Sequence, residues 1–208
     1  MRRFLLFMLL SVICTTAFAQ KQLTEAQSQE VMSQLTQAAT SMRTLQCRFV
    51  QEKLSSMLVE PSVSEGTLHY KAPSRMRWEY VKPYAFALVV SGDRIVKITN
   101  GKSEALEGNS NRIFQGIVNI IMGSASGKKL FDLSVFDVVM YDDGTFWKAE
   151  MTPKRRDMKR MFSQLVFHFD KKSQIIDHLE FIEPQGDRTV IRFEEVRLNE
   201  KIGEERFQ

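Results

Sequence analysis

The chain holds few residues of the kinds that form disulfides or bind metals. Two cysteines, Cys14 and Cys47, occur in 208 residues. Cys14 lies in a segment that we expect to be removed on export, so the remaining chain has one cysteine and cannot form an internal disulfide bond. Cys47 has no evident base near it in the sequence, which favours a buried small hydrophobe over a redox or nucleophilic residue.

Histidine is equally scarce, and no catalytic motif stands out. The three histidines, His69, His168 and His178, lie on expected strands without the spacing of metal ligands, so we predict no metal site. No nucleotide-binding motif is present, and the sequence predicts no cofactor. The Gly-Ser-Ala-Ser-Gly run at 123–127 has alanine where a nucleophile elbow has its serine. We therefore expect a protein that is not an enzyme.

Neither sign of charge dominates the chain. Its 29 basic and 25 acidic side chains are spread along the whole length. This balance, without any nucleic-acid-binding motif, predicts no nucleic-acid partner. One basic cluster, at 154–160, could contact anionic lipid head groups or a partner protein. A solvated loop between strands is the simpler explanation of that cluster.

Long apolar runs are absent beyond the N-terminus, and no later segment approaches transmembrane length. Residues 1–19 are typical of an export signal, with arginines at the basic end, an apolar run and a small-x-small cleavage site before Gln20. Cys14 could instead anchor a lipoprotein, but Ile13 before it is too large for that processing. We expect residues 20–208 to form one exported domain.

Hydrophobic periodicity is what the chain does have. Thr24 and Gln27 fit a capping box, and apolar residues recur at helical spacing from Val31 to Met42, so we predict an amphipathic helix over 25–42. Period-two patterns separated by turn residues then predict about nine to eleven antiparallel strands, and thus a mainly β protein of the α+β class. The expected strands lie at 45–50, within 66–96, and at 95–99, 103–106, 131–141, 145–151, 163–170, 174–183 and 188–198.

The strand at 75–80 has an unusually bulky apolar face. Charged residues alternate there with Met76, Trp78 and Tyr80, so one face is dry and must be covered. One candidate cover is the segment 109–123, whose isoleucines recur at helical spacing and which ends at a Gly/Ser-rich run. From pattern alone this short helix is either a plug in the core or a lid that can lift.

The stretch 66–96 and its surroundings resemble the outer-membrane lipoprotein carriers of the LolA family. The resemblance spans roughly 31–207 and includes Phe49-x-Gln51, the Gly-x-Leu strand and Lys-x-Pro turn within 66–96, the apolar helix, and the late hairpin at 186–193. It implies a half-open antiparallel β-barrel around an apolar cavity, closed by the N-terminal helix and a helical lid. It also implies a periplasmic carrier that shields the acyl chains of lipoproteins between the inner and outer membranes.

The resemblance assigns expected roles to individual residues and partners. The residues expected to line the acyl-chain cavity are Phe49, Met76, Trp78, Leu88, Val90, Leu165, Phe167 and Phe169. Those expected to form the lid are Ile113, Phe114, Ile117, Ile120 and Ile121. Plain core packing remains the alternative for each. The implied partners are acylated lipoproteins or lipids, an inner-membrane lipoprotein-releasing transporter and an outer-membrane acceptor, with the protein itself a monomer. The alternative function is a carrier or sensor of another acylated lipid or envelope product.

The sequence departs from the family pattern at two places. Family members carry an arginine before the turn proline that holds the lid shut, and here that position is Ala72. Either the latch is missing, or Lys71 or Arg75 replaces it. The proline and glycine that follow the last phenylalanine in the family are also absent after Phe207.

Overall fold

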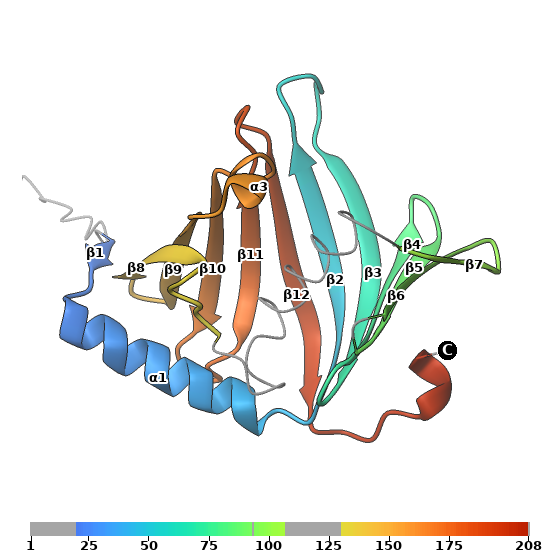
Figure 1. Cartoon of the computed structure of the whole chain (residues 1–208), viewed down its shortest axis with the longest axis horizontal. Helices are drawn as coiled ribbons and strands as arrows, with labels where there is room; N and C mark the ends of the chain where they lie inside the picture. Colours follow the sequence, from blue (N-terminus) through green and yellow to red (C-terminus); the bar gives the residue numbers. More distant parts are fainter. Residues whose placement is uncertain (1–19, 93, 107–129, 208) are drawn as a thin grey trace, which may run out of the picture.

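The computed structural model describes residues 20–92, 94–106 and 130–207. Within them one antiparallel sheet of twelve strands has the order β1-β8-β9-β10-β11-β12-β2-β3-β4-β5-β6-β7 (Figure 1). The strands are β1 (Lys21–Gln22), β2 (Thr44–Leu54), β3 (Ser62–Lys71), β4 (Arg75–Lys82), β5 (Phe86–Ser91), β6 (Arg94–Thr99), β7 (Lys102–Ala105), β8 (Phe136–Asp142), β9 (Phe146–Pro153), β10 (Gln164–Asp170), β11 (Ile176–Ile182) and β12 (Arg188–Leu198). The helices are α1 (Glu25–Ser41), α3 (Arg156–Lys159) and the 3₁₀ turn η1 (Glu204–Phe207).

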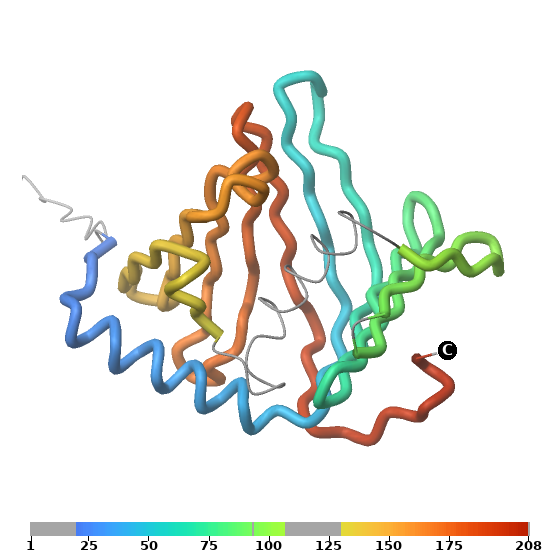
Figure 2. The backbone as a smooth tube through the Cα atoms, viewed as in Figure 1, coloured from blue at the N-terminus to red at the C-terminus, as the bar shows by residue number. Residues whose placement is uncertain are grey.

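The sheet is an open barrel, which confirms the predicted fold class. Its end strands, β1 and β7, do not pair with each other in the described chain. Two meanders, β2 to β7 and β8 to β12, meet where β12 runs beside β2 at the centre of the sheet (Figure 2). The sheet has one strand more than the predicted maximum of eleven. The additional strand is β1, whose two residues are too few to show a period-two pattern. In the described residues no helix is long and apolar enough to cross a membrane.

Helix α1 forms as the sequence predicts. Thr24 Oγ1 accepts a hydrogen bond from the Gln27 amide at 3.3 Å, and Gln27 Oε1 accepts one from the Thr24 amide at 3.1 Å, so the capping box is complete. Val31 and Leu35 are the buried residues of this helix. The helix lies along one end of β8 to β12 and covers the same face of the sheet as the main core (Figure 1). We call this face the inner face.

A single cluster of buried side chains covers the inner face. It extends from Leu35 on α1 through Phe49 and Trp78 to Phe169 and Ile191. Strict alternation puts these residues on one side of their strands, as the sequence predicts for β4 and β10. The core therefore sits in the curve of the sheet, under α1.

The C-terminal segment covers part of the opposite, outer face. Ala87 and Val89 of β5 alternate with the inner-face residues, yet they are 2% and 6% exposed. The turn η1 contacts β4 and β5, and Ile202 and Phe207 are buried there. Thr44 at the start of β2 also donates its hydroxyl to the Glu200 carbonyl at 2.6 Å, which ties the segment to the sheet.

One expected strand begins later than predicted, and two expected segments lie outside the described residues. The strand predicted over 131–141 starts only at Phe136, because Asp132 Oδ1 accepts the amide of Ser134 and forms a turn before it. The predicted export signal and the predicted lid helix at 109–123 lie outside the described residues. The basic cluster at 154–160 forms a helical turn, α3, between β9 and β10.

Candidate functional site

An apolar pocket of about 140 Å³ lies between the C-terminal half of α1 and the inner face of the sheet. Aliphatic, aromatic and thiol side chains make up most of its wall, and a few polar side chains border it. The lining residues are Leu35, Ala38, Ala39, Ser41, Met42, Leu45, Cys47, Leu68, Leu130, Phe169, Ser173, Gln174, Ile175, Ile176, Phe193, Val196, Leu198 and Asn199. A pocket of this kind accepts hydrocarbon more readily than a polar ligand.

Small residues on α1 help to create the space. Ala38 and Ala39 face the sheet where Leu35 and Met42 flank them one turn away. Their methyl groups fill little volume, so the helix covers the sheet without filling the gap beneath it. The amphipathic pattern of 25–42 predicts the helix. That Ala38 and Ala39 line a pocket could not be predicted, because it depends on where the sheet lies relative to the helix.

A bulge in β12 supplies another part of the wall. The register of β12 against β2 shifts between Glu194 and Arg197, and Glu195 has a positive φ of 53°. The extra residue reverses the alternation, so Val196 and Leu198 follow Phe193 into the pocket wall. Without the bulge, Glu195 and Arg197 would occupy those positions and the pocket would be charged.

The eight residues expected to line an acyl-chain cavity all belong to the buried inner-face cluster. Their exposed fractions run from 0% for Leu165 to 7% for Leu88. Phe169 also lines the pocket, whereas the other seven pack against neighbouring side chains in the cluster. Contact between these side chains and a ligand stays a prediction. The five expected lid residues lie outside the described parts of the chain.

Aromatic rings form a continuous row across β2, β4 and β5 next to the pocket. Phe49 lies 4.8 Å from Trp78 and 5.1 Å from Tyr80, and Tyr80 stacks on Phe86 at 4.5 Å between centroids. The hydroxyl of Tyr80 donates to Gln51 Oε1 at 2.8 Å. Burial raises the pKa of Tyr80 to about 12, so this hydroxyl keeps its proton at any physiological pH.

Two donors on this face have no hydrogen-bond partner among the described residues. They are the hydroxyl of Tyr70 and Nε1 of Trp78, both buried. An unpaired buried donor is costly, and a carbonyl oxygen entering the face would satisfy it. The inner face can therefore offer hydrogen bonds to a ligand that is otherwise apolar.

Cys47 is part of the pocket wall, and its thiol is unreactive. Burial raises the pKa of its thiol to about 12, and it is 7% exposed. The thiol is therefore protonated and unreactive in the folded protein. Its place in the wall agrees with the expected role as a small hydrophobe.

Comparison with known proteins gives this arrangement a family. Residues 40–208 match the family described as outer membrane lipoprotein carrier protein LolA. The chain belongs to the LolA family. Similar curated proteins are outer-membrane lipoprotein carrier proteins from Methylobacillus flagellatus, 25% identical over 69% of this chain and 67% of the relative, and from Nitrosospira multiformis, 26% identical over 80% and 77%.

A solved structure supports the fold of this LolA family member. An uncharacterized conserved protein from Thermus thermophilus superposes with a TM-score of 0.53 at 11% identity. The match covers 87% of this chain and 92% of that one. At this identity the likeness concerns the shared sheet architecture.

Ala72, where the family resemblance leads us to expect a latch arginine, lies in the turn between β3 and β4. Ala72 packs against the core, and its amide donates to the Arg43 carbonyl at 2.8 Å. The neighbouring cations Lys71 and Arg75 both form ion pairs with Glu204 of the C-terminal segment. In the described chain these two candidates for the latch therefore bind the outer-face segment.

Two of the five basic residues in the cluster at 154–160 form ion pairs. Lys154 pairs with Asp137 at 3.1 Å, and Arg155 pairs with Asp157 at 2.6 Å. Arg156, Lys159 and Arg160 are exposed. The cluster is a surface turn that contacts β9, and Met158 of this turn packs against the core.

Proposed function

We propose that this protein carries acylated lipoproteins through the periplasm from the inner to the outer membrane and shields their acyl chains on the inner face of its sheet. The observation that supports this most directly is the apolar pocket under α1, which borders the buried aliphatic and aromatic cluster of the inner face. Family membership over residues 40–208 supports the same role.

The energetics of transfer fit such a face. Burial of each methylene stabilises a bound chain by about 0.8 kcal/mol, so one long acyl chain represents roughly 10 kcal/mol relative to water. A bilayer offers the same gain. The carrier therefore has to bind an acyl chain with about the same free energy as the bilayer does, and it has to keep the chain out of water. A loosely filled apolar site without ionic contacts meets both requirements.

Loading needs more room than the pocket now has. A cavity of about 150 Å³ holds a molecule of the size of benzene, and the pocket here is about 140 Å³. We propose that α1 moves away from the sheet when acyl chains enter. The entering acyl chains would then cover the apolar surface that the displaced helix leaves on the sheet, together with Val31 and Leu35 of the helix itself.

The proposed partners follow from this role. Acyl chains leave a bilayer slowly by themselves, so an inner-membrane lipoprotein-releasing transporter would deliver the passenger and an outer-membrane acceptor would receive it. The proposed activity is transfer without bond making or breaking, and the carrier is not an enzyme in this scheme. Unpaired donors at Tyr70 and Trp78 would meet carbonyl groups of the acylated passenger.

Mass spectrometry of the protein purified natively from periplasm tests the proposal. We expect a bound triacylated lipoprotein in the wild type and its loss in Trp78→Glu, because a carboxylate in the buried cluster repels hydrocarbon. The control is Val59→Glu, whose side chain is fully exposed on the β2–β3 hairpin. Free lipid alone would favour a lipid sensor, and an empty wild-type protein would contradict both.

A further inference from the structure

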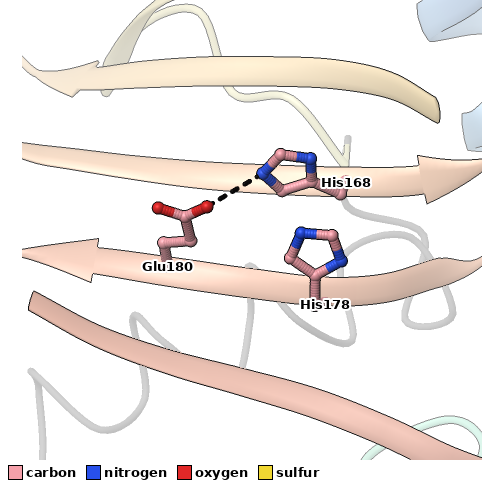
Figure 3. Close-up of side chains that lie close together, drawn as sticks. All are labelled: His168, His178 and Glu180. Atoms are coloured by element: carbon pink, nitrogen blue, oxygen red, sulfur yellow. Dashed lines mark hydrogen bonds and ion pairs between the residues drawn. The ribbon is translucent and has the colours of Figure 1, made fainter. Parts of the chain in front are cut away.

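Two histidines and a glutamate gather on the outer face, away from the pocket. His168 on β10 lies directly opposite His178 on β11, and Glu180 follows on the same face of β11 (Figure 3). One ligand atom from each residue lies within 4.8 Å of those of the other two. The sequence could not predict this cluster, since it depends on the register that pairs β10 with β11.

Neighbouring groups orient each member of the cluster. His178 Nδ1 shares a hydrogen bond with Asp177 Oδ2 at 2.8 Å, which leaves Nε2 turned toward His168 and Glu180 (Figure 3). His168 Nε2 is 3.1 Å from Glu180 Oε1. The other carboxylate oxygen of Glu180 accepts bonds from Arg188 at 2.7 Å and 2.6 Å. A carboxylate behind a ligating imidazole is the usual outer partner in metal sites.

The surroundings keep this face partly dry. His168 and Glu180 are 9% and 8% exposed, and the Phe146 ring stands edge-on to both imidazoles, at 6.1 Å and 5.4 Å. The charged groups beside the cluster are Lys148, paired with Glu150 at 2.7 Å, and Arg192, which lies opposite His178 on β12.

The protonation states in the cluster suit a cation. Burial lowers the pKa of His178 below its usual 6.5, despite the hydrogen bond to Asp177, so the ring is neutral at pH 7. Burial acts to raise the pKa of Glu180, but hydrogen bonds from His168 and Arg188 outweigh it and lower that pKa to about 2. A neutral imidazole and an ionised carboxylate are the forms that bind metals.

We propose that His168, His178 and Glu180 bind one divalent transition-metal ion, with Zn²⁺ as the representative. Two imidazoles and one carboxylate form a donor set that zinc and its neighbours in the first row prefer, with a fourth position left for water. The ion replaces the proton shared by His168 Nε2 and Glu180 Oε1, while Arg188 keeps the carboxylate in place.

The two imidazoles must reorient before both can bind one ion. The imidazoles stack at 3.9 Å between centroids with 15° between their planes, so their in-plane nitrogen lone pairs lie in nearly parallel planes. In a tetrahedral zinc site, ligand nitrogens lie about 3.4 Å apart, as bonds of about 2.1 Å require. To bind one ion, the rings would have to turn so that a nitrogen of each points toward it. Metal binding therefore links β10 to β11 and, through Arg188, to β12.

Zn²⁺ titration of the tag-free, chelator-treated protein tests the proposal. We expect calorimetry to give one site per chain, Co²⁺ to give visible absorption of a tetrahedral complex, and Zn²⁺ to raise the midpoint of thermal unfolding. His178→Gln and His168→Gln should each abolish these signals. His69→Gln, which removes the histidine on β3 outside the cluster, is the matched control and should bind as the wild type does.

Two further measurements separate binding from folding. Asp177→Asn leaves the ligands intact and should weaken Zn²⁺ binding about 10-fold, since it replaces the charged carboxylate partner of His178 Nδ1 with a neutral amide. Circular dichroism of each metal-free variant reports whether the fold is retained. The proposal is overturned if the wild type binds no stoichiometric Zn²⁺, or if folded His168→Gln and His178→Gln bind it like the wild type.

Discussion

Phe49 lies directly opposite Gly66 in the β2–β3 pair, and its ring occupies the space that a side chain on Gly66 would need. A β-carbon at Gly66 would be 2.4 Å from Cζ of Phe49 and 2.1 Å from the backbone oxygen of Glu79. The ring can therefore cross β3 and contact Trp78 and Tyr80 on the next strand. This glycine is what allows the aromatic row to continue across the inner face.

Gly66→Ala should destabilise the protein by about 1–3 kcal/mol, because the methyl group forces the Phe49 ring and the backbone of β4 apart. Denaturant unfolding measures the change. The control is Ser62→Ala on the exposed start of the same strand. Equal stability of both variants would show that the ring has room to shift.

Ala39→Leu should reduce uptake of acyl chains while the fold is retained. The added side chain points into the pocket between α1 and the sheet, where it takes the place of ligand. We expect affinity for a fluorescent acyl probe to fall about tenfold, a loss of about 1.4 kcal/mol. Gln37→Leu, on the exposed side of the same helix, should leave the affinity unchanged. Unaltered binding in Ala39→Leu would place the acyl site elsewhere.

Stability should fall when the pH drops below 4.5, in part because Glu79 becomes protonated. The hydrogen bond from Arg77, at 2.9 Å, holds the pKa of Glu79 below its usual 4.5, although burial opposes this shift. A lowered folded pKa means that the pair stabilises the protein above pH 4.5 and loses its effect as pH falls further. Glu79→Gln should therefore lower the free energy of unfolding at pH 7. It should also reduce the difference between the free energies of unfolding that urea titrations give at pH 7 and at pH 3. Glu60→Gln, at an exposed loop position, should leave that difference intact.

Phe207→Ala should loosen the C-terminal segment from the outer face. We expect a loss of about 1–3 kcal/mol, smaller than for a phenylalanine in the inner-face core, because only one short segment loses its packing. Hydrogen exchange should show the new exposure at Ala87 and Val89 of β5, which lie under this segment. Lys201→Ala, at an exposed position of the same segment, is the control. Unchanged protection of β5 would mean that η1 is not its cover.

Cys47 should resist thiol reagents until the protein unfolds. Its raised pKa, about 12, and its burial leave almost no accessible thiolate at pH 8. We expect modification by a disulfide reagent to follow global unfolding in denaturant. Rapid labelling of the folded protein would show that the pocket opens widely without ligand.

The local features of the fold could be predicted because neighbouring residues determine them. Thr24 and Gln27 form the expected capping box, and Asn100 and Gly101 have the positive φ values, 52° and 72°, of the expected hairpin turn. Leu165 and Phe167 face the core as their alternation indicates.

Features that depend on contacts between distant strands could not be predicted from the sequence pattern. The bulge at Glu195 inserts one residue into an otherwise regular alternation, so a strict period-two interpretation would place Arg197 rather than Val196 on the inner face. The pocket also needs α1 to lie over β12, which no local signal specifies. The pairing of His168 with His178 depends in the same way on strand register.

The β12–β2 seam has a consequence for how the molecule assembles. Each meander is built from hairpins between consecutive strands, which close short loops and can form early. The seam instead joins Phe49 to Phe193 and Leu45 to Leu198, residues about 150 positions apart in the sequence. The β12–β2 seam should therefore be the last contact to form. Until then the two meanders expose the apolar surfaces of their inner faces. The folding chain would need protection from aggregation during that interval.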